Sequence, residues 1–176
     1  MEDWKTKFYC DLGKKFAKSR RKGSNTTVNE AVQKKRCKNG NDFEKLVLNE
    51  FFENGFWVWK LKNESGTPFD LMSVKKGLAF GIECKHLDKM PKTFRISQLR
   101  DNQLIGLDNF TNYGESFVVF GNDDDIRVID FKQLAEMGKM PVSDGTPLEL
   151  FFKLVRASQN LKRKDLERSI NDGNHS

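Results

Sequence analysis

Cysteine is scarce in this sequence, and its three residues, Cys10, Cys37 and Cys84, are widely spaced and form no CxxC pair. Neither a disulfide framework nor a zinc knuckle is therefore indicated. No run approaches the roughly 18 apolar residues of a membrane-spanning helix, and the N-terminus lacks the apolar core of a signal peptide. We therefore expect a soluble protein of the reducing cytoplasm, without a membrane partner.

Linkers and internal repeats are also missing. Pro, Gly and Ser form no linker after residue 41. A length of 176 residues fits one domain, and a hydrophobic content of 37% with 15 Phe supplies a core. We expect this domain to cover residues 41–176 and to follow an N-terminal arm at residues 1–40.

The arm holds most of the positive charge. Residues 1–40 contain 12 Lys and Arg against 4 Asp and Glu, a net charge of +8, whereas the remainder has a net charge of −2. Such a concentration is typical of an extension that binds phosphate, although a solubilising tail has the same composition. We expect a basic arm, partly helical or flexible, that contacts nucleic acid through Lys14, Lys15, Lys18, Arg20, Arg21, Lys22, Lys34, Lys35 and Arg36.

The stretch that organises the domain predicts a β-hairpin. Phe69–Val74 is the first strand, Lys75–Gly77 supplies a tight turn, and Leu78–Lys85 is the second strand. Side chains alternate across a strand, so Glu83 and Lys85 share one face. The opposite face, which we expect in the core, carries Phe80, Ile82 and Cys84.

This hairpin can bring Asp70 across from Glu83 and Lys85. Two carboxylates at bonding distance repel each other unless a cation lies between them. Oxygen ligands on a partly open site suit Mg²⁺, for which we expect Mn²⁺ to substitute. Lys85 can hold or polarise an attacking water. The group is therefore suited to hydrolysing a phosphodiester.

The same residues carry a family resemblance. Pro68-Phe69-Asp70 followed by Glu83-Cys84-Lys85 resembles the PD-(D/E)xK nuclease signature. Asn41–Glu44 opens a helix upstream, and Phe94–Gln103 follows downstream. Together they resemble the RecU-type Holliday junction resolvases, especially the small phage versions, over about residues 41–135.

This resemblance implies an Mg²⁺-dependent, structure-selective endodeoxyribonuclease. It would resolve four-way junctions by paired symmetric nicks in DNA recombination and repair, as a homodimer whose basic arm contacts the junction. By family analogy, the Cys84 carbonyl is a third metal ligand beside Asp70 and Glu83. Glu44 supports a metal or its water shell, and Gln103 orients the water or Lys85.

The order of the remaining elements also indicates the fold class. Asp42 can cap a helix from Phe43 to about Asn54, and Ser97 a helix to about Phe110. Strands are expected at residues 56–61, 115–120 and 125–129, before a helix capped by Asp130. This order predicts an α/β fold with a mixed central β-sheet flanked by helices, as in restriction-endonuclease-like proteins.

Several residues around the hairpin are further candidates for DNA contact. Trp57 and Trp59 could stack on bases, but core packing is the better interpretation for both. The residues that could touch phosphates from the loop after the hairpin are Lys89, Lys92 and Arg95. Residues 62–66 form only a short turn where the family has an insertion that enters the junction, which leaves more of branch recognition to the arm.

Two other functions use the same residues. One is a restriction-type or recombination-associated PD-(D/E)xK nuclease that cuts duplex or single-stranded DNA. The other is a non-catalytic DNA-binding protein whose basic arm makes all the contacts. Comparing cleavage of a four-way junction with cleavage of a matched duplex distinguishes the restriction-type nuclease from a junction resolvase. Substitution of Asp70 distinguishes the non-catalytic DNA-binding protein from a nuclease.

Overall fold

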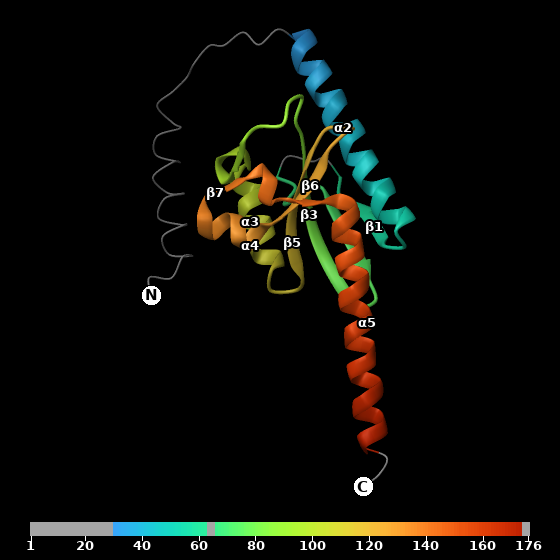
Figure 1. Cartoon of the computed structure of the whole chain (residues 1–176). Helices are drawn as coiled ribbons and strands as arrows, with labels where there is room; N and C mark the ends of the chain where they lie inside the picture. Colours follow the sequence, from blue (N-terminus) through green and yellow to red (C-terminus); the bar gives the residue numbers. More distant parts are fainter. Residues whose placement is uncertain (1–29, 63–65, 174–176) are drawn as a thin grey trace.

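The computed structural model describes residues 30–62 and 66–173, and the side chains of residues 39–62 and 66–160 (Figure 1). The predictions made for residues 1–29 lie outside these ranges. The division of the chain at residue 40 stays a prediction. Within the described ranges, no helix has both the length and the apolar character that crossing a bilayer requires.

A six-stranded sheet forms the centre of the molecule, in the order β1-β2-β3-β5-β6-β8. Only β3 and β5 pair in parallel, whereas the other neighbours are antiparallel. The sheet is therefore mixed, as predicted. The strands are β1 (Trp57–Lys60), β2 (Leu71–Lys75), β3 (Leu78–His86), β5 (Glu115–Gly121), β6 (Ile126–Asp130) and β8 (Thr146–Pro147).

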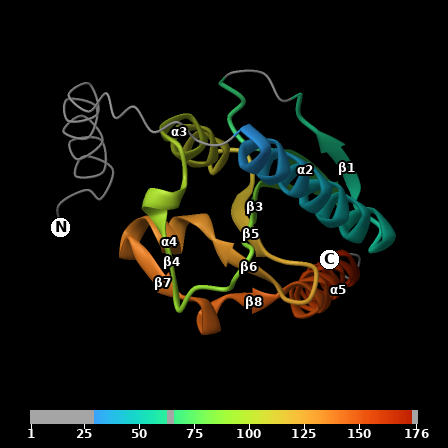
Figure 2. The same ribbon diagram turned by 90° about the horizontal axis from the view of Figure 1, so that it is seen from above.

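Helices cover both faces of this sheet (Figure 2). Helices α2 (Glu30–Glu53) and α5 (Leu148–Gly173) pack on one face, and α3 (Asp101–Phe110) and α4 (Phe131–Met137) on the other. The second half of α5 extends beyond the body of the molecule (Figure 1). A small second sheet pairs β4 (Thr93–Arg95) with β7 (Lys139–Pro141) beside α4.

The predicted hairpin is present as β2 and β3. Leu71 pairs with Ile82 and Lys75 with Leu78. The turn between them places Lys76 and Gly77 at φ values of 47° and 80°, as a two-residue hairpin turn requires. The expected inward residues Phe80, Ile82 and Cys84 are buried under α2 and α5. The hairpin therefore directs its alternate residues to the α3 face.

Two predicted helix starts are wrong. The helix expected to begin at Asp42 belongs to α2, which starts at Glu30 and continues through Gly40. A helix-interior Gly costs only about 1 kcal/mol, which the burial of Phe43, Val47 and Phe51 on the sheet offsets. The helix expected from Ser97 begins at Asp101, because residues 96–98 form a separate 3₁₀ turn.

Helix α3 lies unusually close to the segment that leads into β2. A Cβ added to Gly106 would lie 2.3 Å from the Pro68 Cβ and 2.6 Å from the Pro68 carbonyl oxygen. Only glycine allows this approach. Because Pro68 is two residues before Asp70, this contact fixes where the chain enters the hairpin.

We expect Gly106→Ala to destabilise the protein by about 1–3 kcal/mol, because the added methyl overpacks the contact with Pro68. Gly40→Ala is the matched control, since Gly40 is also helical but has nothing within 4 Å of an added Cβ. That change should stabilise by about 0.5–1 kcal/mol. Thermal unfolding of both variants measures the difference. Equal stability of Gly106→Ala and the unaltered protein would contradict the close contact.

Candidate active site

Asp70 stands opposite Glu83 at the open end of the hairpin. The Asp70 backbone N–H donates to the Ile82 carbonyl (3.1 Å), and its own carbonyl accepts from the Leu61 N–H (2.9 Å). These two bonds tie Asp70 to both neighbouring strands directly before β2 begins, although Ile82 already pairs with Leu71. The Asp70 Oδ2 accepts a hydrogen bond from the Cys84 backbone N–H (2.8 Å).

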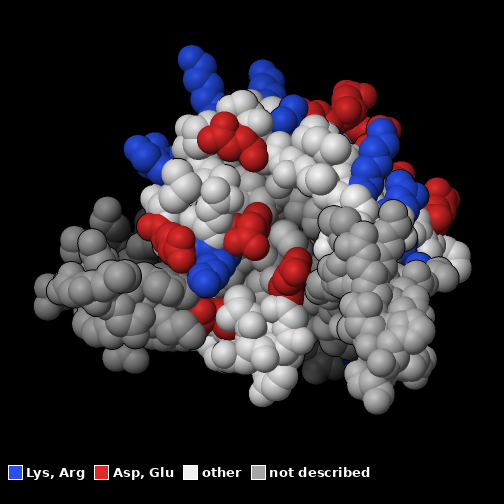
Figure 3. All heavy atoms as spheres, turned by 60° about the horizontal axis from the view of Figure 1, so that its bottom comes forward, with Lys and Arg blue, Asp and Glu red and all other residues white. Residues whose placement is uncertain are grey.

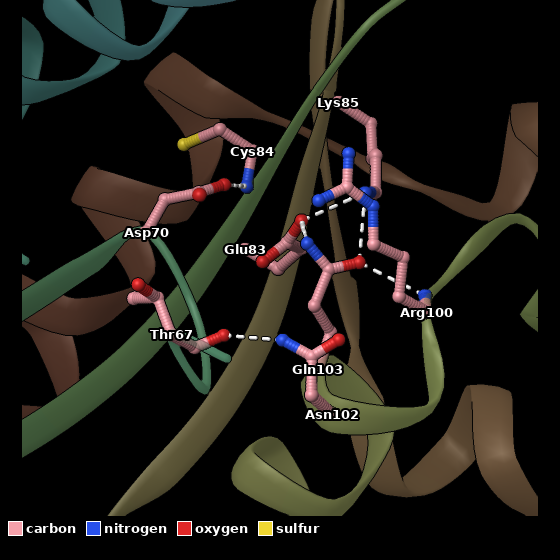
Figure 4. Close-up of polar contacts among 8 residues, drawn as sticks. All are labelled: Thr67, Asp70, Glu83, Cys84, Lys85, Arg100, Asn102 and Gln103. Atoms are coloured by element: carbon pink, nitrogen blue, oxygen red, sulfur yellow. Dashed lines mark hydrogen bonds and ion pairs between the residues drawn. The ribbon is translucent and has the colours of Figure 1, made fainter. Parts of the chain in front are cut away.

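Glu83, Lys85 and Gln103 form one hydrogen-bonded group beneath α3 (Figure 4). The Lys85 Nζ lies 2.8 Å from Glu83 Oε1 and donates to Gln103 Oε1 at 3.0 Å. The Gln103 Nε2 donates to Glu83 Oε1. Gln103 Oε1 also accepts from the Arg100 backbone N–H (2.9 Å), which anchors the carboxamide at the start of α3.

Burial raises the pKa of both acids. Glu83 is only 1% exposed. Its burial, together with the neighbouring Asp70 charge, raises the pKa of Glu83 to about 8 despite the nearby Lys85. Burial also raises the pKa of Asp70, although the hydrogen bond from Cys84 opposes this shift. Two acids that are this costly to ionise together gain from a cation between them.

The donors present fit a hard divalent cation such as Mg²⁺. Glu83 Oε2 is buried and has no hydrogen-bond partner among the described residues, and the Asp70 carboxyl adjoins the same group. Among those residues no three His, Cys, Asp or Glu side chains cluster as ligands. Mg²⁺ does not require such a cage, because it binds through one or two carboxylates and keeps waters and substrate phosphates.

The backbone of Cys84 faces the same edge as Asp70. In a strand, the N–H and C=O of one residue point to the same side, and the Cys84 N–H is bonded to Asp70. Its carbonyl is therefore directed toward the Asp70 side, where the family analogy expects a third ligand. The thiol is buried in the core cluster under α2, as predicted for a filler.

Glu44 reaches the neighbourhood of the site from α2, but it pairs with a residue that the sequence did not suggest. Its Oε2 lies 2.5 Å from the Nζ of Lys60, whose β1 position shares the α2 face with Leu71. The Glu44 charge contributes to the raised pKa of Asp70. Its predicted role in supporting a metal stays a prediction.

Sequence reasoning missed two residues at the start of α3. Asn102 Nδ2 donates to the Thr67 carbonyl (2.6 Å) and so ties α3 to the segment before Asp70. Arg100 is exposed and projects its side chain toward Lys85 and Glu83 in Figure 4. The sequence did offer a signal for Arg100. It lies three residues before Gln103, and residues three apart are neighbours on the surface of a helix.

The predicted phosphate contacts occupy different parts of the molecule. Lys89, Lys92 and Arg95 are exposed on the loop after β3 and on β4. Lys34, Lys35 and Arg36 lie in the first turns of α2, where only the backbone is described. The side of the domain seen in Figure 3 carries basic and acidic groups interspersed. Among the described residues, that side therefore shows no surface of a single sign to attract a polyanion.

Comparison with solved structures finds proteins of similar fold. The fold resembles Hjc, a Holliday junction resolvase from the archaeal hyperthermophile Archaeoglobus fulgidus, with a TM-score of 0.53 and 18% sequence identity. The match covers 64% of this chain and 99% of that protein. The chain has a restriction-endonuclease-like fold. No family model and no curated protein matches the sequence.

This likeness confirms the predicted fold class. At 18% identity it extends to the fold alone. The neighbour belongs to the archaeal Hjc resolvases, so the narrower RecU-type and phage-like assignment still depends on the sequence motif.

Proposed function

We propose that this chain is an Mg²⁺-dependent endonuclease that cuts four-way DNA junctions, of the RecU type that its motif resembles. The observation that carries the proposal is the grouping of Asp70, Glu83, Lys85 and Gln103 at one point of the sheet. The likeness of the fold to a Holliday junction resolvase supports the choice of substrate.

In this proposal each polar side chain of the site has a separate role. Asp70 and Glu83, with the Cys84 carbonyl, hold Mg²⁺, which supplies Lewis-acid stabilisation of the charge that develops on the phosphate. Lys85 positions and polarises the attacking water. Gln103 keeps the Lys85 ammonium in place through its Oε1, and that atom is itself held by the Arg100 N–H.

The substrate also bears on the assembly. A four-way junction has near two-fold symmetry and requires two opposed cuts. A homodimer with two matching sites meets this need. The basic residues of the arm and the exposed Lys89, Lys92 and Arg95 supply contacts to the phosphates of the arms of the junction.

The decisive test compares a synthetic four-way junction with a linear duplex of matched sequence, each with Mg²⁺ and with EDTA. We expect Mg²⁺-dependent paired nicks near the branch point and little cutting of the duplex. Glu83→Gln is the inactive control. Equal cutting of both substrates would favour a restriction-type or recombination nuclease and would remove the claim of junction resolution.

A further inference from the structure

Two tryptophans expected in the core lie on the surface instead. Trp57 and Trp59 of β1 are each 57% exposed. Their rings are nearly parallel, with an interplanar angle of 23° and centroids 6.1 Å apart. Core packing was therefore the wrong prediction for both residues. The alternation of β1 instead buries Val58 and Lys60 partly under α2 and leaves the two indoles on the opposite face.

The register of the sheet places this pair beside the candidate active site. Trp59 pairs with Met72, and Met72 pairs with Gly81. Two residues before Met72, Asp70 bonds through its carbonyl to the Leu61 N–H and through its carboxylate to the Cys84 N–H, next to Glu83. Trp59 is therefore a diagonal neighbour of Asp70, and such positions are about 7–8 Å apart.

The arrangement of the two rings also has a direction. Trp57 precedes Trp59 along β1, and their two indoles lie side by side in nearly parallel planes. The next residue on this side of the strand is Leu61, whose N–H donates to the Asp70 carbonyl. A planar group that stacks on Trp59 would therefore lie within two strand positions of Asp70.

We propose that Trp57 and Trp59 form a stacking surface for an unpaired DNA base beside the scissile phosphate. This inference rests on the proposed nuclease function and extends it to the selection of branched DNA. Bases stack on exposed aromatic side chains without regard to sequence. A branch point offers bases that can leave the helical stack, whereas the bases of an intact duplex remain covered by their neighbours.

The size and charge of the surface favour a base over a second copy of this chain. A stable protein interface buries about 800 Å² and some 20–30 residues on each side, whereas β1 has four residues. Exposed lysines lie beyond both ends of the pair, Lys62 after β1 and Lys76 in the turn next to the Trp57 row. Cations flanking aromatic rings are complementary to the phosphates on either side of a stacked base.

This contact also addresses how the chain recognises a branch, since the sequence predicts only a short turn at residues 62–66. The basic arm attracts any DNA, since contacts to phosphate carry no information on structure. A stacking surface close to the carboxylates instead distinguishes branched DNA from duplex DNA, because only a base that can leave the helical stack can reach it. Selection of the branch then takes place at the site of cutting.

The test measures binding without cleavage, with EDTA present, for the junction and for the matched duplex. We expect Trp59→Ala to weaken junction binding about 5- to 150-fold and to leave duplex binding within about two-fold. Trp59→Phe should restore much of the loss, because it keeps an aromatic face. Phe52→Ala is the matched control, since Phe52 is a 69% exposed aromatic on α2 and its removal should change neither affinity.

A fluorescent base analogue at the branch point supplies the second readout. The unaltered protein should quench 2-aminopurine at the branch, and Trp59→Ala should not. Equal losses for junction and duplex, or no loss for the junction, would overturn the proposal. A dimer that becomes a monomer on Trp59→Ala would also overturn it, by assigning the surface to a second copy. If Trp59→Ala weakens binding of the junction but not of the duplex, and the unaltered protein cuts no DNA, the stacking surface is supported and the nuclease function is rejected.

Discussion

Asp70→Asn should abolish cleavage of the four-way junction and leave its binding intact or tighter. The amide loses the negative charge that holds the cation, and the cation contributes several kcal/mol of transition-state stabilisation, or about 10³-fold or more in rate. The Asn oxygen can still accept the hydrogen bond that Asp70 receives from the Cys84 N–H. Binding is retained because the substitution reduces the repulsion between the site and the phosphates. Single-turnover cleavage and gel-shift titration measure the two effects.

Asp123→Asn is the matched control for this experiment. Asp123 is exposed in the turn between β5 and β6, so the same change of charge there should leave the cleavage rate within about two-fold, as surface substitutions away from a site generally do. Cleavage by Asp70→Asn at the rate of the unaltered protein would reject the site. If the protein binds DNA without cutting it, and neither substitution changes the binding affinity, the non-catalytic interpretation is favoured.

Glu83→Gln should stabilise the metal-free protein increasingly as the pH rises. The pKa of Glu83 is about 8 in the folded protein and near its ordinary value in the unfolded chain. Between those values the folded state binds more protons than the unfolded state, so its free energy of unfolding falls with rising pH. Gln carries no such cost. Near pH 5 the two proteins should be equally stable, and at pH 9 the variant should be more stable by on the order of a few kcal/mol.

Thermal unfolding in EDTA between pH 5 and 9 measures this difference, which we expect as a rise of roughly 5–10 °C in Tm at the upper end. Added Mg²⁺ should stabilise the unaltered protein, more strongly at high pH, because the carboxylates must be deprotonated to bind it. It should have little effect on Glu83→Gln. Glu115→Gln, an exposed position at the start of β5, should show neither effect. If the Tm of Glu83→Gln and that of the unaltered protein change in parallel with pH, Glu83 does not have the raised pKa of a buried acid.

The hairpin could be predicted because its signals are local. Alternation decides which residues of β3 face the core, and Gly77 has the positive φ that the turn requires. Once the hairpin forms, Asp70 lies directly before β2 and beside the part of β3 that carries Glu83. The Asp130 cap was equally readable, because its side chain accepts from the Gln133 N–H within one turn.

Features that depend on distant partners were not predictable in the same way. Whether Trp57 and Trp59 are buried depends on which helix covers their side of β1, and α3 packs farther along the sheet, against β3 and β5. The Lys60–Glu44 ion pair joins α2 to β1, and no spacing in the sequence indicates it. The start of α2 was missed because the packing of its later turns on the sheet outweighs the local helix-breaking residues near Gly40.

The uninterrupted course of α2 also sets a distance. The helix runs from Glu30 through the basic residues 34–36 to Glu44 and onward to Glu53. At 1.5 Å per residue, residues 34–36 lie about 12–15 Å along the axis from Glu44, which equals roughly four base-pair steps of a duplex at about 3.4 Å each. Under the proposed function, phosphates bound by residues 34–36 would lie about that far along the DNA from the position of Glu44.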